Sequence, residues 1–207
     1  MGQESVILFF LLSGFVIDYS FSKSQDQSFS SYFQKRFFRL YIPLIFVLPL
    51  GYLIASDNQS QLINPDWKSL GLNLLMVQDI ASVKPAVLAR PYMDNLPLWS
   101  LSYEWWFYML FYPIVTYVKS PERQSQFVWI LGVVSALLYA LHPNAILRVL
   151  MYLSIWWLGV QLSQLYRNGN RGVLTVRAIA FPLSGIAAST AILLFQCWMT
   201  KLQGQEL

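Results

Sequence analysis

The chain has 207 residues, of which 56% are hydrophobic and 12% are charged, and its formal net charge is +4. Since a soluble domain carries about 25% charged residues, this composition excludes a soluble globular domain and indicates a protein embedded in a lipid bilayer. The basic residues do not indicate a nucleic-acid partner, because they lie between apolar runs, where the positive-inside bias of membrane proteins accounts for them.

Apolar runs separated by polar stretches predict an all-α, polytopic bundle of about six transmembrane helices. The runs cover residues 5–17, 40–55, 98–118, 127–141, 145–165 and 178–199. The first is short, since a helix needs about 20 residues to cross the hydrocarbon core. Within the long polar stretch 56–95, the apolar residues 70–76 are too few to cross and are expected to form a short interfacial or re-entrant helix.

The lysines and arginines predict how the bundle is oriented. Nine of them lie after the first, third and fifth runs, and five lie on the opposite side. The positive-inside rule therefore places the first group in the cytoplasm. The chain would then begin outside, which predicts that a further segment normally precedes Met1.

Glu104 lies one or two turns inside the apolar run 98–118. A carboxylate at the centre of a membrane helix costs about 2.5–3.5 kcal/mol, so such a residue usually faces a partner or a water-filled cavity. At helical spacing, Ser100, Glu104 and Tyr108 share one face. An aromatic stripe is expected beside this face, formed by Trp99, Tyr103 and Phe107. The pattern favours a functional cavity, with a structural hydrogen bond between helices as the alternative.

A basic aromatic collar, residues 32–39 (YFQKRFFR), precedes the second run. Arg36 and Arg39 are three residues apart, so on a helix both guanidinium groups can point the same way. Arginine forks bind phosphate in bidentate geometry, which makes the pair a candidate phosphate site. The spacing alone favours the alternative, a collar at the membrane interface that meets anionic lipid.

The remaining candidate residues are more simply explained by structural roles. Ser13 and Gly14 are small residues in the first run, which predicts close packing against another helix. His142 is the single histidine, and although histidine is the most common general base, its position before a proline predicts a loop or capping residue. No Cys/His cluster, phosphate loop or nucleophile motif is present, so no metal site is predicted. The single cysteine, Cys197, excludes a disulfide within the chain.

Three stretches together resemble the acyltransferase 3 family of multi-span membrane O-acyltransferases. Residues 8–17 (LFFLLSGFVI) are similar to its Phe-Phe-x-x-Ser-Gly-Phe segment, and residues 32–43 (YFQKRFFRLYIP) to its Arg-x-x-Arg helix entry. Residues 98–113 (LWSLSYEWWFYMLFYP) resemble its Trp-Ser-Leu-x-x-Glu-x-x-Phe-Tyr block. The resemblance covers residues 6–113, and beyond them it is mainly one of hydropathy.

The resemblance implies an enzyme that moves an acyl group, usually acetyl, from cytoplasmic acyl-CoA to a hydroxyl of a carbohydrate or similar acceptor. Acyl-CoA would be a co-substrate, and no bound cofactor is implied. Arg36 and Arg39 would face the phosphates of the coenzyme, and Glu104 would play a supporting catalytic role near the acceptor. Four further residues would line the pocket: Ser13, Trp99, Ser100 and Tyr108.

The chain departs from the family pattern in one respect. Family members carry an arginine and the expected catalytic histidine on a helix before the segment that matches residues 8–17, and they have about ten spans. We therefore expect residues 1–207 to be one partial transmembrane domain, truncated at both ends and inactive as written. The alternatives are a non-enzymatic transporter, an envelope-complex component or a non-functional remnant. The bacterial plasma membrane is the expected location.

Overall fold

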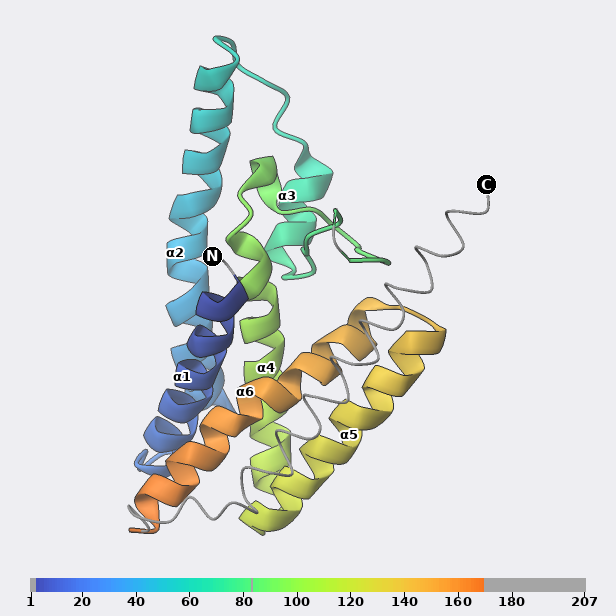
Figure 1. Cartoon of the computed structure of the whole chain (residues 1–207). Coiled ribbons are helices and arrows are strands. Elements are labelled where there is room, and N and C mark those ends of the chain that lie inside the picture. The colour runs from blue at the N-terminus through green and yellow to red at the C-terminus, as the bar shows by residue number, and fades with distance from the viewer. Residues whose placement is uncertain (1–2, 83, 170–207) are drawn as a thin grey trace. The chain divides into compact units, whose positions relative to one another are not determined.

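The computed structural model describes residues 3–82 and 84–169, which form six α-helices and one 3-10 turn (Figure 1). The helices are α1 (Gln3–Ser22), α2 (Phe29–Asn58), α3 (Trp67–Leu74), α4 (Leu98–Tyr117), α5 (Pro121–Leu141) and α6 (Ala145–Arg167), and the turn is η1 (Tyr92–Asp94). This part of the chain contains no strand, so the predicted all-α class is confirmed. The run 178–199, predicted as a sixth span, lies outside the described residues.

Four of these helices are long and apolar enough to cross a membrane: α1, α2, α5 and α6. The helix predicted over 98–118 exists as α4, with 20 residues. Its many Trp and Tyr residues and Glu104 give it a lower hydropathy, so its crossing stays a prediction. The short interfacial helix predicted over residues 70–76 corresponds to α3, which begins earlier, at Trp67.

The second helix is much longer than the apolar run that predicted it. α2 begins at Phe29 because the side chain of Ser28 accepts a hydrogen bond from the backbone N–H of Ser31 and so caps the first turn. Its 30 residues correspond to about 45 Å at 1.5 Å per residue, more than the hydrocarbon thickness of about 30 Å. The basic aromatic collar is therefore the first part of this helix.

The described residues divide into two compact units, one of residues 3–23 and 115–169 and the other of residues 24–82 and 84–114. In the first unit, α1 and α6 cross at Gly14 and Gly159. A Cβ atom added at Gly14 would lie 2.2 Å from the carbonyl oxygen of Trp156, and one at Gly159 would lie 2.0 Å from that of Leu11. The predicted close packing at Ser13 and Gly14 is thus confirmed.

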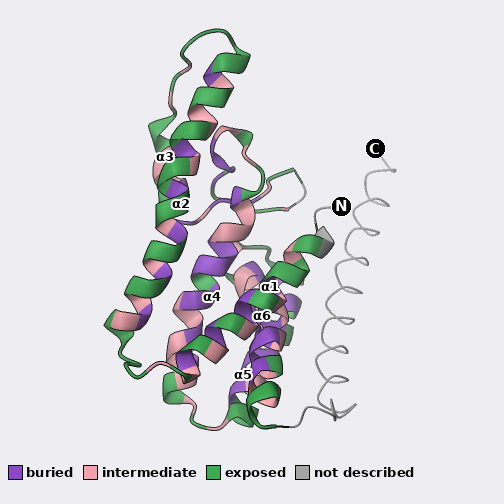
Figure 2. Ribbon diagram, turned by 90° about the vertical axis from the view of Figure 1, so that its left-hand side faces the viewer, coloured by how far each residue is buried: buried purple, intermediate pink, exposed green. Residues whose placement is uncertain are grey.

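The second unit contains α2, α3, η1 and most of α4. Aromatic rings join α2 to α4, with Tyr41 packed edge-on against Trp105 at 5.1 Å between ring centroids. Figure 2 shows that buried residues line α4, whereas much of α2 is exposed. α4 is therefore the helix around which the polar groups of this unit are arranged.

Candidate functional site

Glu104 and Tyr108 form the centre of a buried polar network in the second unit. Glu104 is 2% exposed and Tyr108 is fully buried. The two residues are one turn apart on α4, where positions i and i+4 share a face, and the hydroxyl of Tyr108 donates a hydrogen bond to Oε1 of Glu104. The carboxylate therefore has a partner on its own helix, whereas the functional cavity expected around Glu104 stays a prediction.

Arg36 of α2 joins this network through aromatic rings. Its guanidinium carbon lies 5.4 Å from the ring centroid of Tyr32 and 5.8 Å from that of Tyr108, within the range of cation–π contacts. The hydroxyl of Tyr32 donates to the backbone carbonyl of Tyr108 at 3.0 Å. We call these four residues, Tyr32, Arg36, Glu104 and Tyr108, the Arg36–Glu104 network; it brings a buried cation and a buried anion of α2 and α4 together.

The structure separates the two arginines that the sequence placed on one face. Arg36 is 8% exposed, whereas Arg39 is exposed and lies outside the network. The physical reason is that three residues turn an α-helix about 60° short of a full rotation, so one side chain can face α4 while the other lies on the flank of α2. Binding of coenzyme phosphates by this pair stays a prediction.

The predicted pocket residues are only partly brought together. Tyr108 belongs to the network, but the hydroxyl of Ser100 donates at 3.0 Å to the carbonyl of Pro97, the residue just before α4. Trp99 packs edge-on against Tyr103, with ring centroids 5.5 Å apart. Ser13 is buried in the other unit. A shared pocket for these residues therefore stays a prediction.

The predicted aromatic stripe on α4 is confirmed. The ring centroids of Tyr103 and Phe107 are 6.1 Å apart, which extends the contact between Trp99 and Tyr103 by a further turn. The hydroxyl of Tyr103 is not part of the Arg36–Glu104 network, since it belongs to a second polar cluster on the adjacent face of the helix.

That second cluster was not predicted. Asp79, which is 4% exposed, pairs with Lys84 at 2.8 Å and accepts a hydrogen bond from the hydroxyl of Tyr103. The ammonium nitrogen of Lys84 also lies 3.3 Å from that hydroxyl and 3.9 Å from the ring centroid of Trp99. Asp79 and Lys84 occupy a non-helical loop, where no periodicity reveals which side chains turn inward. Their opposite charges, five residues apart, were the available signal.

Backbone contacts show that this cluster fastens the loop before α4 onto the helix. The N–H of Asp79 donates to the carbonyl of Ala89 at 2.9 Å, which closes the loop. The side chain of Gln78 donates to the carbonyl of Leu98 at 3.0 Å, and the hydroxyl of Ser102 donates back to the carbonyl of Gln78 at 2.8 Å. The paired charges therefore hold the loop against the first turns of α4.

Two other polar sites bear on the sequence analysis. In the first unit, Asp18 of α1 pairs with Arg167 of α6 at 2.8 Å. His142 is the exposed C-cap residue of α5, as predicted, and its backbone N–H donates to the carbonyl of Leu138. Among the described residues no group of His, Cys, Asp and Glu could hold a metal ion.

Comparison with known proteins identifies the family. A family model described as an acyltransferase domain, that of acyltransferase 3, matches residues 1–205. Acyltransferase MdmB of Streptomyces mycarofaciens is 35% identical over 113 residues, which are 54% of this chain and 28% of that protein. No solved structure matches. Because the family model covers nearly the whole chain, the chain belongs to the acyltransferase 3 family.

Proposed function

We propose that this chain acts in a membrane acyltransferase that moves an acyl group, acetyl in the simplest case, from acyl-CoA to a hydroxyl of a carbohydrate or similar acceptor. The observation that carries the proposal is the Arg36–Glu104 network. The sequence predicted Arg36 and Glu104 separately, and both are buried in one set of contacts around Tyr108. We further propose the bacterial plasma membrane as its location.

The two arginines would serve the donor in different ways. Arg39 is exposed and can offer its guanidinium fork to a coenzyme phosphate in bidentate geometry. Arg36 is held between the rings of Tyr32 and Tyr108, so it would add positive potential behind the phosphates without free movement. This division keeps both residues in the coenzyme site and makes Arg39 the one that contacts the ligand.

Glu104 would act as a positioning residue. In acyl transfer the acceptor oxygen forms a bond to the acyl carbon, the carbon–sulfur bond breaks, and the acceptor proton must pass to a base. The family resemblance assigns that base to a histidine on a helix that precedes the segment matching residues 8–17. Glu104 accepts a hydrogen bond from Tyr108, and its charge would orient polar groups around the reacting atoms.

The test is binding of acetyl-CoA to the full chain in lipid nanodiscs, measured by isothermal titration calorimetry. Arg39→Ala removes a charge-assisted contact worth about 1.5–3 kcal/mol, so we expect affinity to fall about tenfold or more. Arg39→Lys keeps the charge but not the fork, so its affinity should lie between the two. The matched control is Lys35→Ala, which removes another charge from the same exposed side of the collar and should leave affinity nearly unchanged.

Two results would contradict the proposal. The first is a wild-type chain without measurable affinity for acetyl-CoA, which would favour a transporter or a component of an envelope complex. The second is an equal loss of affinity for Arg39→Ala and Lys35→Ala, because general electrostatic attraction to the collar would then explain binding without a phosphate site.

A further inference from the structure

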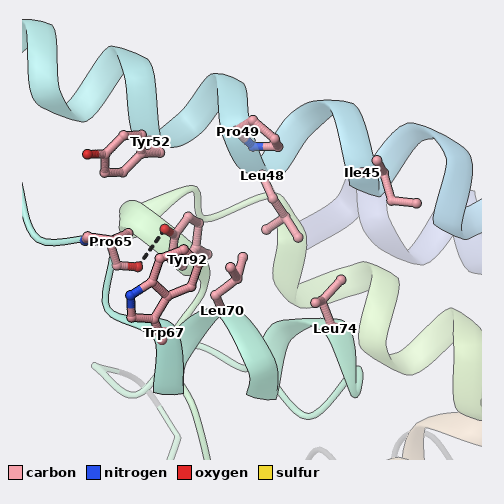
Figure 3. Close-up of a pocket in the computed structure, with 9 residues that line it drawn as sticks. All are labelled: Ile45, Leu48, Pro49, Tyr52, Pro65, Trp67, Leu70, Leu74 and Tyr92. Atoms are coloured by element: carbon pink, nitrogen blue, oxygen red, sulfur yellow. Dashed lines mark hydrogen bonds between the residues drawn. The ribbon is translucent and has the colours of Figure 1, made fainter.

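A recess with apolar walls lies between α2 and α3 (Figure 3), and no member of the Arg36–Glu104 network lines it. Its volume is about 510 Å³, within the range of about 300–1,000 Å³ that small-ligand pockets occupy. Leu48 and Pro49 of α2 line one side, and Leu70 and Leu74 of α3 line the other. The recess is therefore large enough for a ligand and is separate from the proposed coenzyme site.

Aromatic side chains lie at one end of the recess, and the hydroxyls of its two tyrosines are already engaged. The hydroxyl of Tyr92 donates to the carbonyl of Pro65 at 2.6 Å (dashed in Figure 3), and that of Tyr52 donates to the carbonyl of Ile63 at 2.9 Å. None of the nine described residues that line the recess carries a charge. The walls thus offer a ligand apolar surface and little else.

These walls determine which kind of molecule can fill the recess. A sugar or a coenzyme would give up its hydrogen bonds to water without replacement, at a cost of several kcal/mol. Each water molecule in the recess would require two to four polar partners, which the walls lack. A hydrocarbon chain requires only dispersion contacts, and the residues that line the recess lose such contacts when the recess is empty. The chemistry therefore favours an aliphatic ligand.

The recess adjoins an exposed apolar surface of α2. α2 is one of the helices able to cross the membrane, and its exposed residues next to the recess include Ile45 at 57%, Phe46 at 72% and Leu50 at 55%. Ile45 belongs both to that surface and to the lining of the recess. Tyr52 lies about 20 Å along α2 from Arg39, so the aromatic end of the recess lies away from the basic collar, towards the opposite interface, where Trp and Tyr are enriched.

We propose that this recess binds a hydrocarbon tail of a bilayer lipid. The tail lies between Leu48 on α2 and Leu70 on α3, and the headgroup lies at the aromatic end near Trp67. Lys68, exposed and adjacent to Trp67, is available to a headgroup phosphate. The site would hold one tail in a fixed place on α2, and it stands whether or not the acyl-transfer proposal is correct.

The experiment uses the full chain in vesicles of phosphatidylethanolamine and phosphatidylglycerol. A small fraction of the phosphatidylethanolamine carries a diazirine on an acyl chain, and labelled residues are mapped by mass spectrometry after irradiation. We expect labelling of the α2 and α3 residues of the recess to saturate as the probe fraction rises, whereas labelling of Phe46 should rise in proportion. Leu70→Trp fills the recess and should reduce the saturable labelling about tenfold, a change of about 1.4 kcal/mol.

The control variant is Leu53→Trp, which adds the same side chain to an exposed position of α2 outside the recess and should leave saturable labelling unchanged. Competition of the wild-type chain with unlabelled lysophosphatidylethanolamine gives a second measurement that needs no variant, so misfolding of Leu70→Trp would not remove the test. Labelling that rises in proportion to the probe everywhere would overturn the proposal, since lipid would then only surround the helix. Protection of the recess from all labelling would also overturn it, because protein would fill the space.

Discussion

Replacing Gly159 by alanine tests the crossing of α1 and α6 directly. The added Cβ would lie 2.0 Å from the carbonyl oxygen of Leu11, 2.8 Å from the nitrogen of Phe15 and 2.9 Å from the carbonyl carbon of Leu11. All three are backbone atoms, so no side-chain rotation can relieve the overlap. To restore a contact of 3.4 Å, the lower limit of ordinary van der Waals separation, the helices would have to move apart by more than 1 Å.

The expected loss of stability follows from that movement. Overpacking of a well-packed interior typically costs about 1–3 kcal/mol and occasionally more. We expect a cost at the upper end of this range, because backbone atoms cannot move aside as side chains can. A loss of about 3 kcal/mol changes the ratio of folded to unfolded protein about 150-fold. The separation would also stretch the ion pair between Asp18 and Arg167, now 2.8 Å long. Gly14→Ala should behave similarly, because its Cβ would lie 2.2 Å from the carbonyl oxygen of Trp156.

The assay is unfolding by sodium dodecyl sulfate in mixed micelles, followed by circular dichroism. Two other glycines provide a graded control. A Cβ at Gly132 meets the side chain of Ser154 at 3.0 Å, which can shift, and a Cβ at Gly51 meets nothing within 4 Å. We expect a small loss for Gly132→Ala and a neutral to slightly stabilising effect for Gly51→Ala, because alanine favours helix. If Gly159→Ala unfolds at the same detergent fraction as Gly51→Ala, the close crossing of α1 and α6 is wrong.

Three further predictions use the same unfolding assay. Tyr108→Phe removes a buried donor to Glu104 and should cost about 1–3 kcal/mol. Asp79→Asn leaves Lys84, whose side chain is 13% exposed, without its carboxylate partner and should cost up to about 3 kcal/mol, whereas the further change Lys84→Met should recover part of that loss. Burial raises the pKa of Tyr92 above its ordinary value, so its neutral form favours the folded state; that contribution is complete below about pH 10 and is lost as the pH rises through the folded pKa.

Each of these predictions has a matched control. Tyr112→Phe removes a hydroxyl that donates to an exposed carbonyl of Gln27. If Tyr112→Phe and Tyr108→Phe lose the same stability, the buried hydrogen bond to Glu104 contributes no more than an exposed one. Lys119→Met removes an exposed lysine and should change stability by less than about 0.5 kcal/mol. Strict additivity of Asp79→Asn and Lys84→Met would contradict the ion pair. Tyr92→Phe should reduce the alkaline loss of stability, and an unchanged pH profile would contradict the assignment to Tyr92.

Features that depend on helical periodicity could be predicted from the sequence. The hydropathy runs located the helices, the spacing of Glu104 and Tyr108 predicted their shared face, and the small residue Gly14 predicted a close approach. The start of α2 was not predicted, although its cap is a serine. Six serines lie between residues 20 and 31, and each is a competent N-cap, so composition alone does not identify Ser28.

Contacts between distant segments could not be predicted, because no local pattern encodes them. The hydrogen bond from Tyr32 to Tyr108 joins residues 76 positions apart, and it is this contact that turns Arg36 towards α4. Asp79 and Tyr103 are 24 positions apart, and one of them lies in an irregular loop. In both cases the residue on α4, Tyr108 or Tyr103, was predicted to lie on a stripe of that helix. Its contact with Tyr32 or Asp79 was not predicted.

The burial of Arg36 and that of Glu104 explain each other. A charge taken out of water is costly unless it has partners. The ring of Tyr108 contacts the guanidinium of Arg36, and its hydroxyl donates to Glu104, so one residue links the cation on α2 to the anion on α4. The same contacts hold the two helices together, so residues proposed to serve the coenzyme also stabilise the unit that contains them. Substitutions at Arg36 or Glu104 should therefore change stability and the proposed coenzyme binding together, whereas Arg39, exposed and outside the network, is the position at which the proposed binding can be tested while the fold is kept.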